Sequence, residues 1–427
     1  MATLIESLSH KPVELSFGTS GLRGLVTDMT DIECYINTLG FLDYVERTGE
    51  SAQTIYIAGD LRASTPRILR AVLAAAVKRE KHVCYFGLVP TPTIALQALK
   101  DIVPCIMVTG SHIPADRNGI KFYKADGEIL KADEQGIKEA VAKVRAALYK
   151  SDFAESGFGV DGNLLTAQAL PDTLPDAVNG YISNFTNVFS GKPFDGKQVV
   201  VYQHSAVGRD LLVRLLTDLG AEVIAEGRSE VFIPIDTENV TPDDQAYFFS
   251  LAQKHPNAFA IVSTDGDSDR PFMIDEKGIF HRGDELGAVV AEVLNADAAA
   301  FPVSSNDNID PYLGENSVSY TRTRIGSPYV IVEMQKEVKA GKRRVVGWEV
   351  NGGFMLGTDI PFANGVLHRL PTRDAFLPLL VTIYEAIQKK STVSDVFKKL
   401  PARFTQAGLI DDFPVVVSQE IVAAFQA

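Results

Sequence analysis

The sequence has only three cysteines, Cys34, Cys84 and Cys105, and their spacing fits neither a disulfide framework nor a metal-ligand motif. Each lies in an apolar stretch, so we expect buried free thiols. No uninterrupted apolar run reaches the ~20 residues that cross a bilayer. The N-terminus has neither the basic nor the apolar region of a secretory signal. These absences predict a cytoplasmic protein that does not engage a membrane.

Basic residues are also scarce. Lys and Arg total 41 against 54 Asp and Glu, for a formal net charge of −13. Nonspecific nucleic-acid binding requires Lys and Arg to neutralise phosphates, so the acidic balance argues against it, although local basic pockets for small anions stay open. With 46% hydrophobic and 22% charged residues the chain is globular, and its 427 residues predict about two to four domains.

Apolar segments alternate as strand, helix and strand. The predicted units are residues 54–58, 66–78 and 82–86; residues 198–202, 208–219 and 221–224; and, more faintly, residues 299–303 and 318–320 around a polar connection. Such units build parallel sheets. Any two of them look alike, so the pattern leaves open whether whole domains are repeated.

Asp265, Asp267 and Asp269 alternate in a segment that directly follows the apolar strand 259–262. Alternate side chains of an extended segment point the same way, so the three carboxylates can converge. They repel one another unless a cation lies between them, and hard oxygen ligands suit Mg²⁺ or Ca²⁺. A solvated acidic turn is the alternative. A calcium EF-hand is excluded, because Arg270 stands where that loop requires Gly.

A second polar loop follows the apolar strand 105–108. Ser111 lies at the carboxyl edge of that strand, where α/β sheets place ligands, and His112 and Lys121 are within reach of the same loop. Three carboxylates leave coordination positions of Mg²⁺ open, and a phosphate oxygen often takes one. Ser111 is therefore a candidate nucleophile or phosphate carrier, with a loop-capping hydroxyl as the alternative.

Two Gly-rich segments add further candidates. Residues 17–24 surround Arg23 with glycines, which let backbone N–H groups approach an anion closely. Residues 347–354 place Glu349 and Asn351 in a predicted Gly-rich turn, and their carboxylate and amide groups suit sugar hydroxyls. An ordinary turn after a strand is the alternative for the second segment.

Together the four loops resemble those of the α-D-phosphohexomutases, the phosphoglucomutase/phosphomannomutase family. Residues 109–121 are similar to its phosphoserine loop, Thr-x-Ser-His-x-Pro…Asn-Gly-x-Lys, and residues 265–270 to its metal loop, Asp-Gly-Asp-x-Asp-Arg. Residues 17–24 match its N-terminal Gly-Thr-Ser-Gly-x-Arg-Gly stretch, and residues 347–354 look like its sugar-binding loop. The resemblance runs over residues 15–400.

The resemblance implies an α/β fold of three tandem, similar mixed α/β domains with only the start of a fourth α+β domain. The implied domains are 1–165 with the Gly-rich and phosphoserine loops, 166–278 with the metal loop, 279–395 with the sugar-binding loop, and 396–427 as the start of a truncated fourth domain. The family's fourth-domain phosphate loop has no counterpart before Ala427. We therefore expect a piece of a longer enzyme with low turnover.

The implied activity is that of a Mg²⁺-dependent phosphohexomutase, an isomerase of the intramolecular phosphotransferase type. It would interconvert the 1- and 6-phosphates of mannose or glucose, with sugar phosphates as its partners and a hexose 1,6-bisphosphate as its activator. Phosphorylated Ser111 would phosphorylate the sugar, the bisphosphate would reorient, and its other phosphate would return to Ser111.

Residue roles follow from the same resemblance. The implied Mg²⁺ ligands are Asp265, Asp267, Asp269 and an oxygen of phosphorylated Ser111. The implied catalytic set is Ser111, Lys121, Arg23, His112 and Arg270, in which Lys121 and Arg23 lie near the proton transfers and the phosphoryl group. The implied substrate contacts are Glu349, Asn351, Gly347 and Arg270.

Three positions differ from the family pattern, and these differences concern which sugar phosphate is the substrate. Asn351 and Gly353 stand where many relatives have Ser and His, and Ser327 stands where some have His. The alternatives are a phosphoglucosamine mutase, a noncatalytic sugar-phosphate sensor and a calcium-stabilised binding module. Asn351 and Gly353 argue against the first, retention of Ser111 and the three aspartates against the second, and Arg270 against the third.

Overall fold

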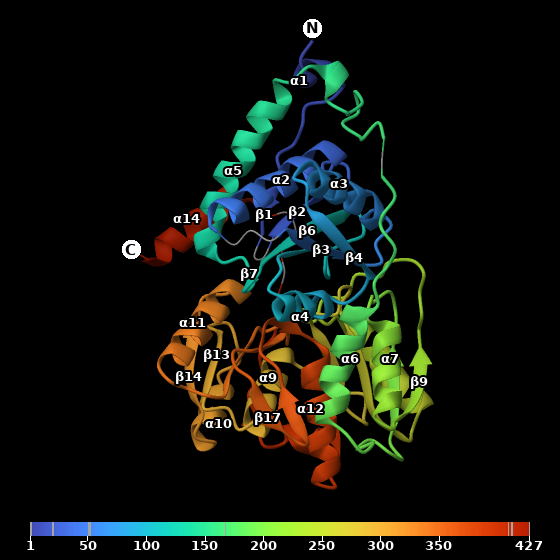
Figure 1. The fold of residues 1–427 in the computed structure, drawn as a ribbon. Coiled ribbons are helices and arrows are strands. Elements are labelled where there is room, and N and C mark those ends of the chain that lie inside the picture. The colour runs from blue at the N-terminus through green and yellow to red at the C-terminus, as the bar shows by residue number, and fades with distance from the viewer. Residues whose placement is uncertain are drawn as a thin grey trace.

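Three mixed sheets, each flanked by helices, form the body of the protein (Figure 1). The computed structural model describes residues 2–18, 21–49, 53–166, 168–408, 410 and 413–426. The first sheet lies in the upper half of Figure 1, and the second and third lie below it. The predicted α/β fold of three tandem, similar domains is confirmed.

The first sheet has the order β1-β2-β6-β5-β3-β4, with β7 paired to β6. Its strands are β1 (Ser16–Phe17), β2 (Gly21–Leu25), β3 (Thr54–Gly59), β4 (His82–Leu88), β5 (Cys105–Val108), β6 (Arg117–Lys124) and β7 (Gly127–Glu128). The accompanying helices are α1 (Leu4–Ser7), α2 (Asp31–Arg47), α3 (Thr65–Lys78), α4 (Thr91–Asp101), α5 (Lys131–Tyr149) and the 3₁₀ turn η1 (Phe153–Glu155).

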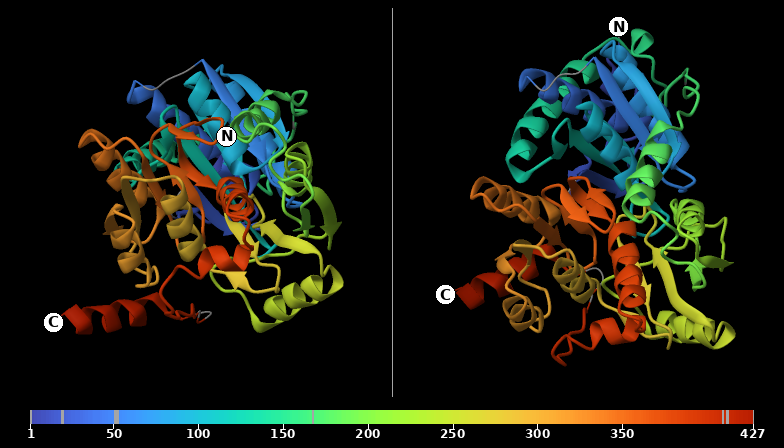
Figure 2. Two further views of the ribbon diagram at one scale, coloured as in Figure 1. Left: turned by 90° about the horizontal axis from the view of Figure 1, so that it is seen from below. Right: turned by 60° about the horizontal axis from the view of Figure 1, so that its bottom comes forward.

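The second sheet has the order β12-β11-β10-β8-β9 and the third the order β14-β13-β15-β16-β19. The second unit contains α6 (Asp176–Val188), β8 (Gln198–Tyr202), α7 (Arg209–Asp218), β9 (Glu222–Glu226), α8 (Pro242–Lys254), β10 (Ala258–Thr264), β11 (Pro271–Ile274) and β12 (Phe280–His281). The third contains α9 (Gly283–Val293), β13 (Ala298–Pro302), α10 (Ile309–Glu315), β14 (Ser319–Thr323), α11 (Ser327–Lys339), β15 (Val345–Trp348), β16 (Phe354–Leu356), β17 (Ile360–Phe362), β18 (Gly365–Leu367), β19 (Leu370–Asp374), α12 (Phe376–Gln388) and α13 (Val393–Phe397). The helix α14 (Val415–Gln426) follows and projects away from the three sheets in Figure 2.

One topology recurs in all three sheets. Counted along the chain from β3, β8 and β13, the four strands are arranged second, first, third, fourth: β4-β3-β5-β6, β9-β8-β10-β11 and β14-β13-β15-β16. The first three strands of each set are parallel and the fourth is antiparallel. This shared order shows that the repetition left open by the sequence pattern is a repetition of whole domains.

Helical periodicity explains how the helices cover the sheets. The predicted stripe of α3 is Ile68, Leu69, Val72, Leu73 and Ala76, and all five side chains are buried in one core cluster with β3 and β5. Residues three and four apart share one helix face, so a single stripe closes one side of the sheet. The predicted strand–helix–strand units all form, with ends that differ by a few residues from the expected ones.

The second and third units share a continuous hydrophobic core that runs from Tyr181 in α6 to Phe397 in α13. The first unit has its own core, and a smaller cluster joins α4 to Ala177 of α6 and Leu370 of β19. Because α4 contacts both other units, the loops at the carboxyl ends of the strands are brought toward a common centre.

The prediction that the three cysteines are buried free thiols is confirmed in part. All three thiols are free, and Cys34 and Cys105 are buried, but Cys84 is half-buried. Within the part of the chain that the structure describes, none of the helices has the length and apolar character needed to cross a bilayer. The bounds of the four domains given above stay predictions.

Candidate active site

Three of the four candidate loops occupy the same position in the three repeated units. Each connects the third strand of its unit to the antiparallel fourth: residues 109–116 join β5 to β6, residues 265–270 join β10 to β11, and residues 349–353 join β15 to β16. Open α/β sheets place their ligands beyond the carboxyl ends of parallel strands. The repeat therefore presents three equivalent loops, one from each unit, to one centre.

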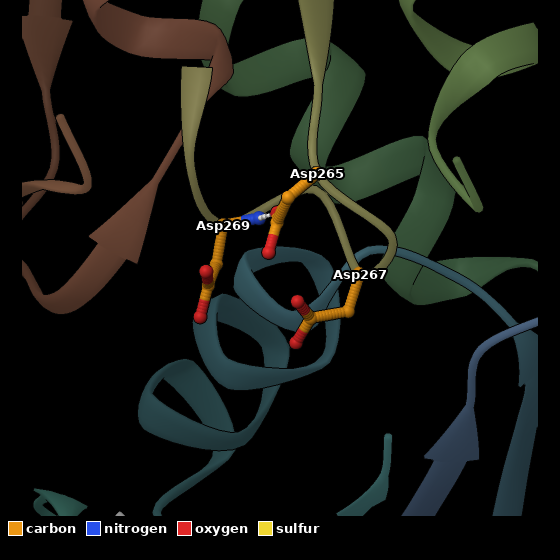
Figure 3. Close-up of side chains that lie close together, drawn as sticks. All are labelled: Asp265, Asp267 and Asp269. Carbon is orange, nitrogen blue, oxygen red and sulfur yellow. Dashed lines mark hydrogen bonds between the residues drawn. The ribbon is translucent and has the colours of Figure 1, made fainter. Parts of the chain in front are cut away.

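The aspartate loop is folded so that its carboxylates face one another (Figure 3). Asp265 Oδ1 accepts hydrogen bonds from the backbone N–H groups of Asp269 and Arg270, both at 3.1 Å. Ser268 at the tip has φ +59°, which turns the chain back within a few residues. Asp265, Asp267 and Asp269 are fully buried, and one oxygen of each lies within 4.8 Å of the others. The predicted convergence is confirmed.

Cationic side chains from two other elements surround the aspartates. Lys121 Nζ in β6 donates to Asp267 Oδ2 at 2.6 Å and to Asp269 Oδ2 at 2.7 Å. Arg373 in β19 donates from Nε to Asp269 Oδ2 at 3.0 Å and from Nη1 to Glu349 Oε2 at 2.6 Å. Glu349 therefore belongs to the same ionic network, in which Arg373 joins the aspartate loop to the 349–353 loop.

The aspartates retain binding capacity beyond these pairs. Among the described residues, neither Asp267 Oδ1 nor Asp269 Oδ1 has a hydrogen-bond partner, although both atoms are buried. Arg270 Nε lies 3.7 Å from Asp269 Oδ1 without donating a hydrogen bond to it. A buried carboxylate oxygen without a hydrogen bond is costly, and three clustered carboxylate oxygens are the donor set that Mg²⁺ or Ca²⁺ prefers. The residues present therefore fit a hard divalent cation. Glu276 would be the twelfth residue of an EF-hand loop that begins at Asp265. It accepts a hydrogen bond from Ser394 Oγ at 2.6 Å.

The pKa values of Asp265 and Asp269 are shifted in opposite directions. Burial, followed by the charges of Asp267 and Asp269, raises the pKa of Asp265 well above its usual range. Burial also acts on Asp269, but Arg373, Lys121 and Arg270 outweigh it and lower the pKa of that carboxyl. The cationic side chains thus hold Asp269 in its charged form.

Ser111 is brought directly to the aspartates. Its Oγ donates to Asp265 Oδ2 at 2.6 Å, its side chain is buried, and its φ is +54°. His112 Nδ1 lies 3.4 Å from the same hydroxyl. Burial, followed by Arg270 and Arg23, lowers the pKa of His112 to about 2, so its ring is neutral near pH 7. The left-handed backbone of a non-glycine residue is strained, and such strain clusters at functional sites.

The N-terminal Gly-rich segment also approaches this centre. Arg23 lies in β2 opposite Gly119 of β6 and is half-buried. Burial lowers its pKa, as do the neighbouring positive charges of Arg270 and Arg373. Thr19 and Ser20 of the same predicted segment lie outside the described residues.

The predicted sugar loop is shorter than expected. Gly347 and Trp348 belong to strand β15, and Trp348 stacks on Phe301 in the core with ring centroids 4.8 Å apart. A Cβ on Gly347 would lie 2.5 Å from Met334 Sδ, so this glycine provides space for α11. The sequence placed both residues in a turn, which is wrong because an apolar strand continues through them.

Asn351 is also held by the protein itself. Its Nδ2 donates to Glu238 Oε1 at 3.1 Å, and its Oδ1 accepts from the Gly353 N–H at 3.0 Å. Only 2% of its surface is exposed. Glu349 thus joins the aspartates through Arg373, Asn351 lies in the same loop as Glu349, and Gly347 lies within strand β15.

Sequence reasoning missed two polar residues that bind the aspartate loop. Thr91, the first residue of α4, donates from its N–H to Asp267 O at 3.0 Å and from Oγ1 to Asp267 Oδ2 at 2.5 Å. Arg373 is the other. A partial signal for Arg373 was present: Arg373 and Asp374 are both charged residues in the wholly buried strand β19, and a buried charge requires a partner.

Three family descriptions match the chain in order. The Phosphoglucomutase/phosphomannomutase alpha/beta/alpha domains I, II and III match residues 14–147, 179–278 and 282–404. A phosphomannomutase of Salmonella muenchen is 40% identical over 408 residues, which are 96% of this chain and 80% of the relative. One of Sinorhizobium fredii is 38% identical over 414 residues, 96% of this chain and 84% of the relative.

More distant proteins share the fold. A phosphoglucosamine mutase of Symbiobacterium thermophilum is 27% identical over 90% of this chain and 82% of its own length. The crystal structure of a putative phosphomannomutase from Thermus thermophilus superimposes with a TM-score of 0.72 at 18% identity, covering 91% of this chain and 84% of that one. The Aspergillus fumigatus N-acetylphosphoglucosamine mutase, in complex with GlcNAc-6P and magnesium, has a TM-score of 0.52 at 14% identity over 92% and 80%.

The fold and the site thus define a phosphoryl-transferring isomerase, a phosphohexomutase. The chain belongs to the phosphoglucomutase/phosphomannomutase family.

Proposed function

We propose that this phosphohexomutase carries its phosphoryl group on Ser111 and acts on mannose or glucose phosphates with Mg²⁺ bound to Asp265, Asp267 and Asp269. The observation that carries the proposal is the 2.6 Å hydrogen bond from Ser111 Oγ to Asp265 Oδ2. It brings the hydroxyl of Ser111, the candidate phosphate carrier of the 109–116 loop, to a carboxylate cluster that fits a divalent cation.

Phosphoryl transfer needs little covalent chemistry from a protein and depends on positioning and charge stabilisation. When bound, Mg²⁺ would offset the phosphate charge beside three carboxylates. Transfer breaks the bond between Ser111 Oγ and phosphorus and forms a bond from phosphorus to a sugar hydroxyl oxygen. The sugar hydroxyl loses one proton and Ser111 Oγ takes up one, so the serine hydroxyl is regenerated without a net release of protons. We propose that Lys121 and Arg23 lie close to the atoms that exchange protons and to the transferring phosphoryl group. His112 is proposed to be neutral beside Ser111.

Arg270 is proposed to contact a phosphoryl or sugar group, and Glu349 and Asn351 to receive sugar hydroxyls. The ion pair from Arg373 to Glu349, at 2.6 Å, supports this because it orients the carboxylate at the same centre as Ser111. Gly347 as a substrate contact stays a prediction, as does a cytoplasmic location. A hexose 1,6-bisphosphate is proposed as the activator, and a variant of the Aspergillus fumigatus enzyme was solved in complex with glucose 1,6-bisphosphate.

The test is steady-state mutase kinetics of Ser111→Ala on a panel of mannose, glucose and glucosamine phosphates. We expect no measurable mutase turnover from Ser111→Ala, because the step in which phosphate is carried is lost. Ser250→Ala is the matched control, since Ser250 is exposed on α8 and its hydroxyl bonds only the Tyr247 carbonyl in the described contacts, at 2.7 Å. Near wild-type turnover by Ser111→Ala would reject the assignment. Preference for glucosamine phosphate would reject the proposed sugar.

A further inference from the structure

A buried guanidinium group lies beneath the 109–116 loop. Arg62, in the connection between β3 and α3, has 2% of its surface exposed. Its Nη1 donates to the carbonyls of Pro114 at 2.7 Å and Arg117 at 2.9 Å, and its Nη2 to those of Ser111 at 3.0 Å and Ile113 at 2.6 Å. One side chain therefore collects four carbonyls of the segment that presents Ser111.

The backbone N–H of Ser111 is linked to Arg62 through Thr109 and Asp60. Asp60 Oδ2 lies 3.3 Å from Arg62 Nε and accepts from Thr109 Oγ1 at 2.8 Å. Thr109 Oγ1 in turn accepts from the Ser111 N–H at 2.8 Å. The backbone N–H and C=O of Ser111 are thus both anchored to the Asp60–Arg62 ion pair. This accounts for how a non-glycine residue persists at φ +54°.

Phe232 links Arg62 to the aspartate loop. The guanidinium carbon of Arg62 lies 3.9 Å from the centroid of the Phe232 ring. The same ring touches the aspartate loop, since a Cβ on Gly266 would lie 2.9 Å from Phe232 Cζ. A Cβ on Gly110 would lie 2.6 Å from the guanidinium carbon, so glycine is required there for this close approach. Arg62 and Phe232 therefore form a packed bridge between the two loops.

We propose that Arg62 is a positioning residue for phosphoryl transfer, which fixes the Ser111 loop in its left-handed conformation and, through Phe232, holds it in register with the aspartates. This inference rests on the proposed role of Ser111. Arg62 itself does not touch the transferred group, since Nη1 and Nη2 donate to backbone carbonyls and Nε lies against Asp60. Its effect acts on the geometry between Ser111 Oγ and Asp265.

The decisive substitution is Arg62→Lys, which keeps the charge and removes the planar fork. An ammonium group is a point donor and cannot hold four carbonyls in the geometry of a guanidinium. We expect kcat, normalised to the fraction of chains that accept phosphate from glucose 1,6-bisphosphate, to fall about 100-fold, as for misplacements of about 1 Å. KM and the Mg²⁺ affinity measured by calorimetry should stay within a few-fold, because the aspartates are unchanged.

Arg67→Lys is the matched control. Arg67 also combines an ion pair, to Asp31 at 2.7 Å, with a backbone carbonyl, that of Met29 at 2.8 Å, but on a different loop. We expect its normalised kcat to remain close to that of the wild type. A loss common to both Lys variants would show that a general loss of packing is sufficient, and would overturn the proposal.

Phe232→Leu provides a second route if Arg62→Lys does not fold. It leaves every hydrogen bond of Arg62 in place and removes the ring that spans the two loops, so we expect normalised kcat to fall at least several-fold with KM little changed. If Arg62→Lys folds and has the normalised kcat of the wild type, the positioning role is overturned. If Arg62→Lys does not fold, a wild-type normalised kcat in Phe232→Leu overturns it. Turnover by Ser111→Ala would instead overturn the proposed function, so the two failures are distinguishable.

Discussion

Replacing Lys121 with Met removes a buried positive charge from beside the aspartates and keeps most of the side-chain stem. The ammonium group donates to Asp267 and Asp269 at 2.6 and 2.7 Å, and all three side chains are buried. Removing one partner of a buried ion pair costs about 3–5 kcal/mol, because the remaining charge is left uncompensated. Arg373 still pairs with Asp269, so we expect the lower end, a free energy of unfolding about 3 kcal/mol smaller in EDTA.

Mg²⁺ should reverse much of this loss. A divalent cation supplies the charge that the variant lacks and no longer competes with the Lys121 ammonium for Asp267 and Asp269. A ligand present at 100 times its Kd stabilises a protein by about 2.7 kcal/mol. The gain in unfolding free energy on adding saturating Mg²⁺ should therefore be larger for Lys121→Met than for the wild type. Urea denaturation in EDTA and in Mg²⁺ measures both quantities.

Lys131→Met is the control for this experiment. Lys131 pairs with Glu134 on the surface of α5, where an ion pair is worth at most about 1 kcal/mol, and it has no contact with the aspartates in the described structure. We expect a small change that does not depend on Mg²⁺. If Lys121→Met is as stable as the wild type in EDTA, or gains no more from Mg²⁺, then Lys121 does not compensate the aspartates and the reasoning is refuted.

Three further substitutions test individual contacts. Asp267→Asn keeps the shape of the side chain but removes one anionic ligand, so calorimetry should show Mg²⁺ affinity lowered at least about 10-fold, and unchanged affinity would contradict the site. His204 Nε2 bonds Thr264 O at 2.7 Å, and burial lowers the pKa of this His to about 4. Its neutral form contributes stability that is complete above pH ~6.5 and is lost as the pH falls toward 4, by about 3 kcal/mol. His204→Gln should remove that component from the pH profile of the unfolding free energy, and identical wild-type and variant profiles would be inconsistent with it. Gly347→Ala places a Cβ 2.5 Å from Met334 Sδ and should lower the free energy of unfolding by about 1–3 kcal/mol without raising KM for the sugar phosphate. A raised KM at unchanged stability would favour the substrate contact instead.

The fold was predictable wherever side-chain periodicity decides the structure. The stripe of α3 and the strand Cys105–Val108 follow directly from the order of apolar residues. The repetition of whole domains did not follow, because it depends on strand order, and strand order is a long-range property that local patterns leave open. Trp348 shows the same limit: adjacent glycines and polar residues indicated a turn, but packing against Phe301 keeps it in strand β15.

The site was predictable where its residues are close in the chain. Asp265, Asp267 and Asp269 converge because five consecutive residues form one tight loop. The partners of Arg373 and Thr91 could not be assigned, since their contacts with this loop join different units of the fold and no local spacing encodes them. The left-handed φ of Ser111 was equally hidden, because it results from the carbonyls that Arg62 collects.

Locating the phosphoryl group on the intact chain tests the central claim most directly. The protein is incubated with glucose 1,6-bisphosphate and Mg²⁺, and intact-mass and tandem mass spectrometry determine how many phosphoryl groups are added and where. The account predicts one adduct of about 80 Da, the mass of a phosphoryl group on a serine, located at Ser111 and absent from Ser111→Ala. An adduct on another residue, or equal labelling of Ser111→Ala, would contradict it.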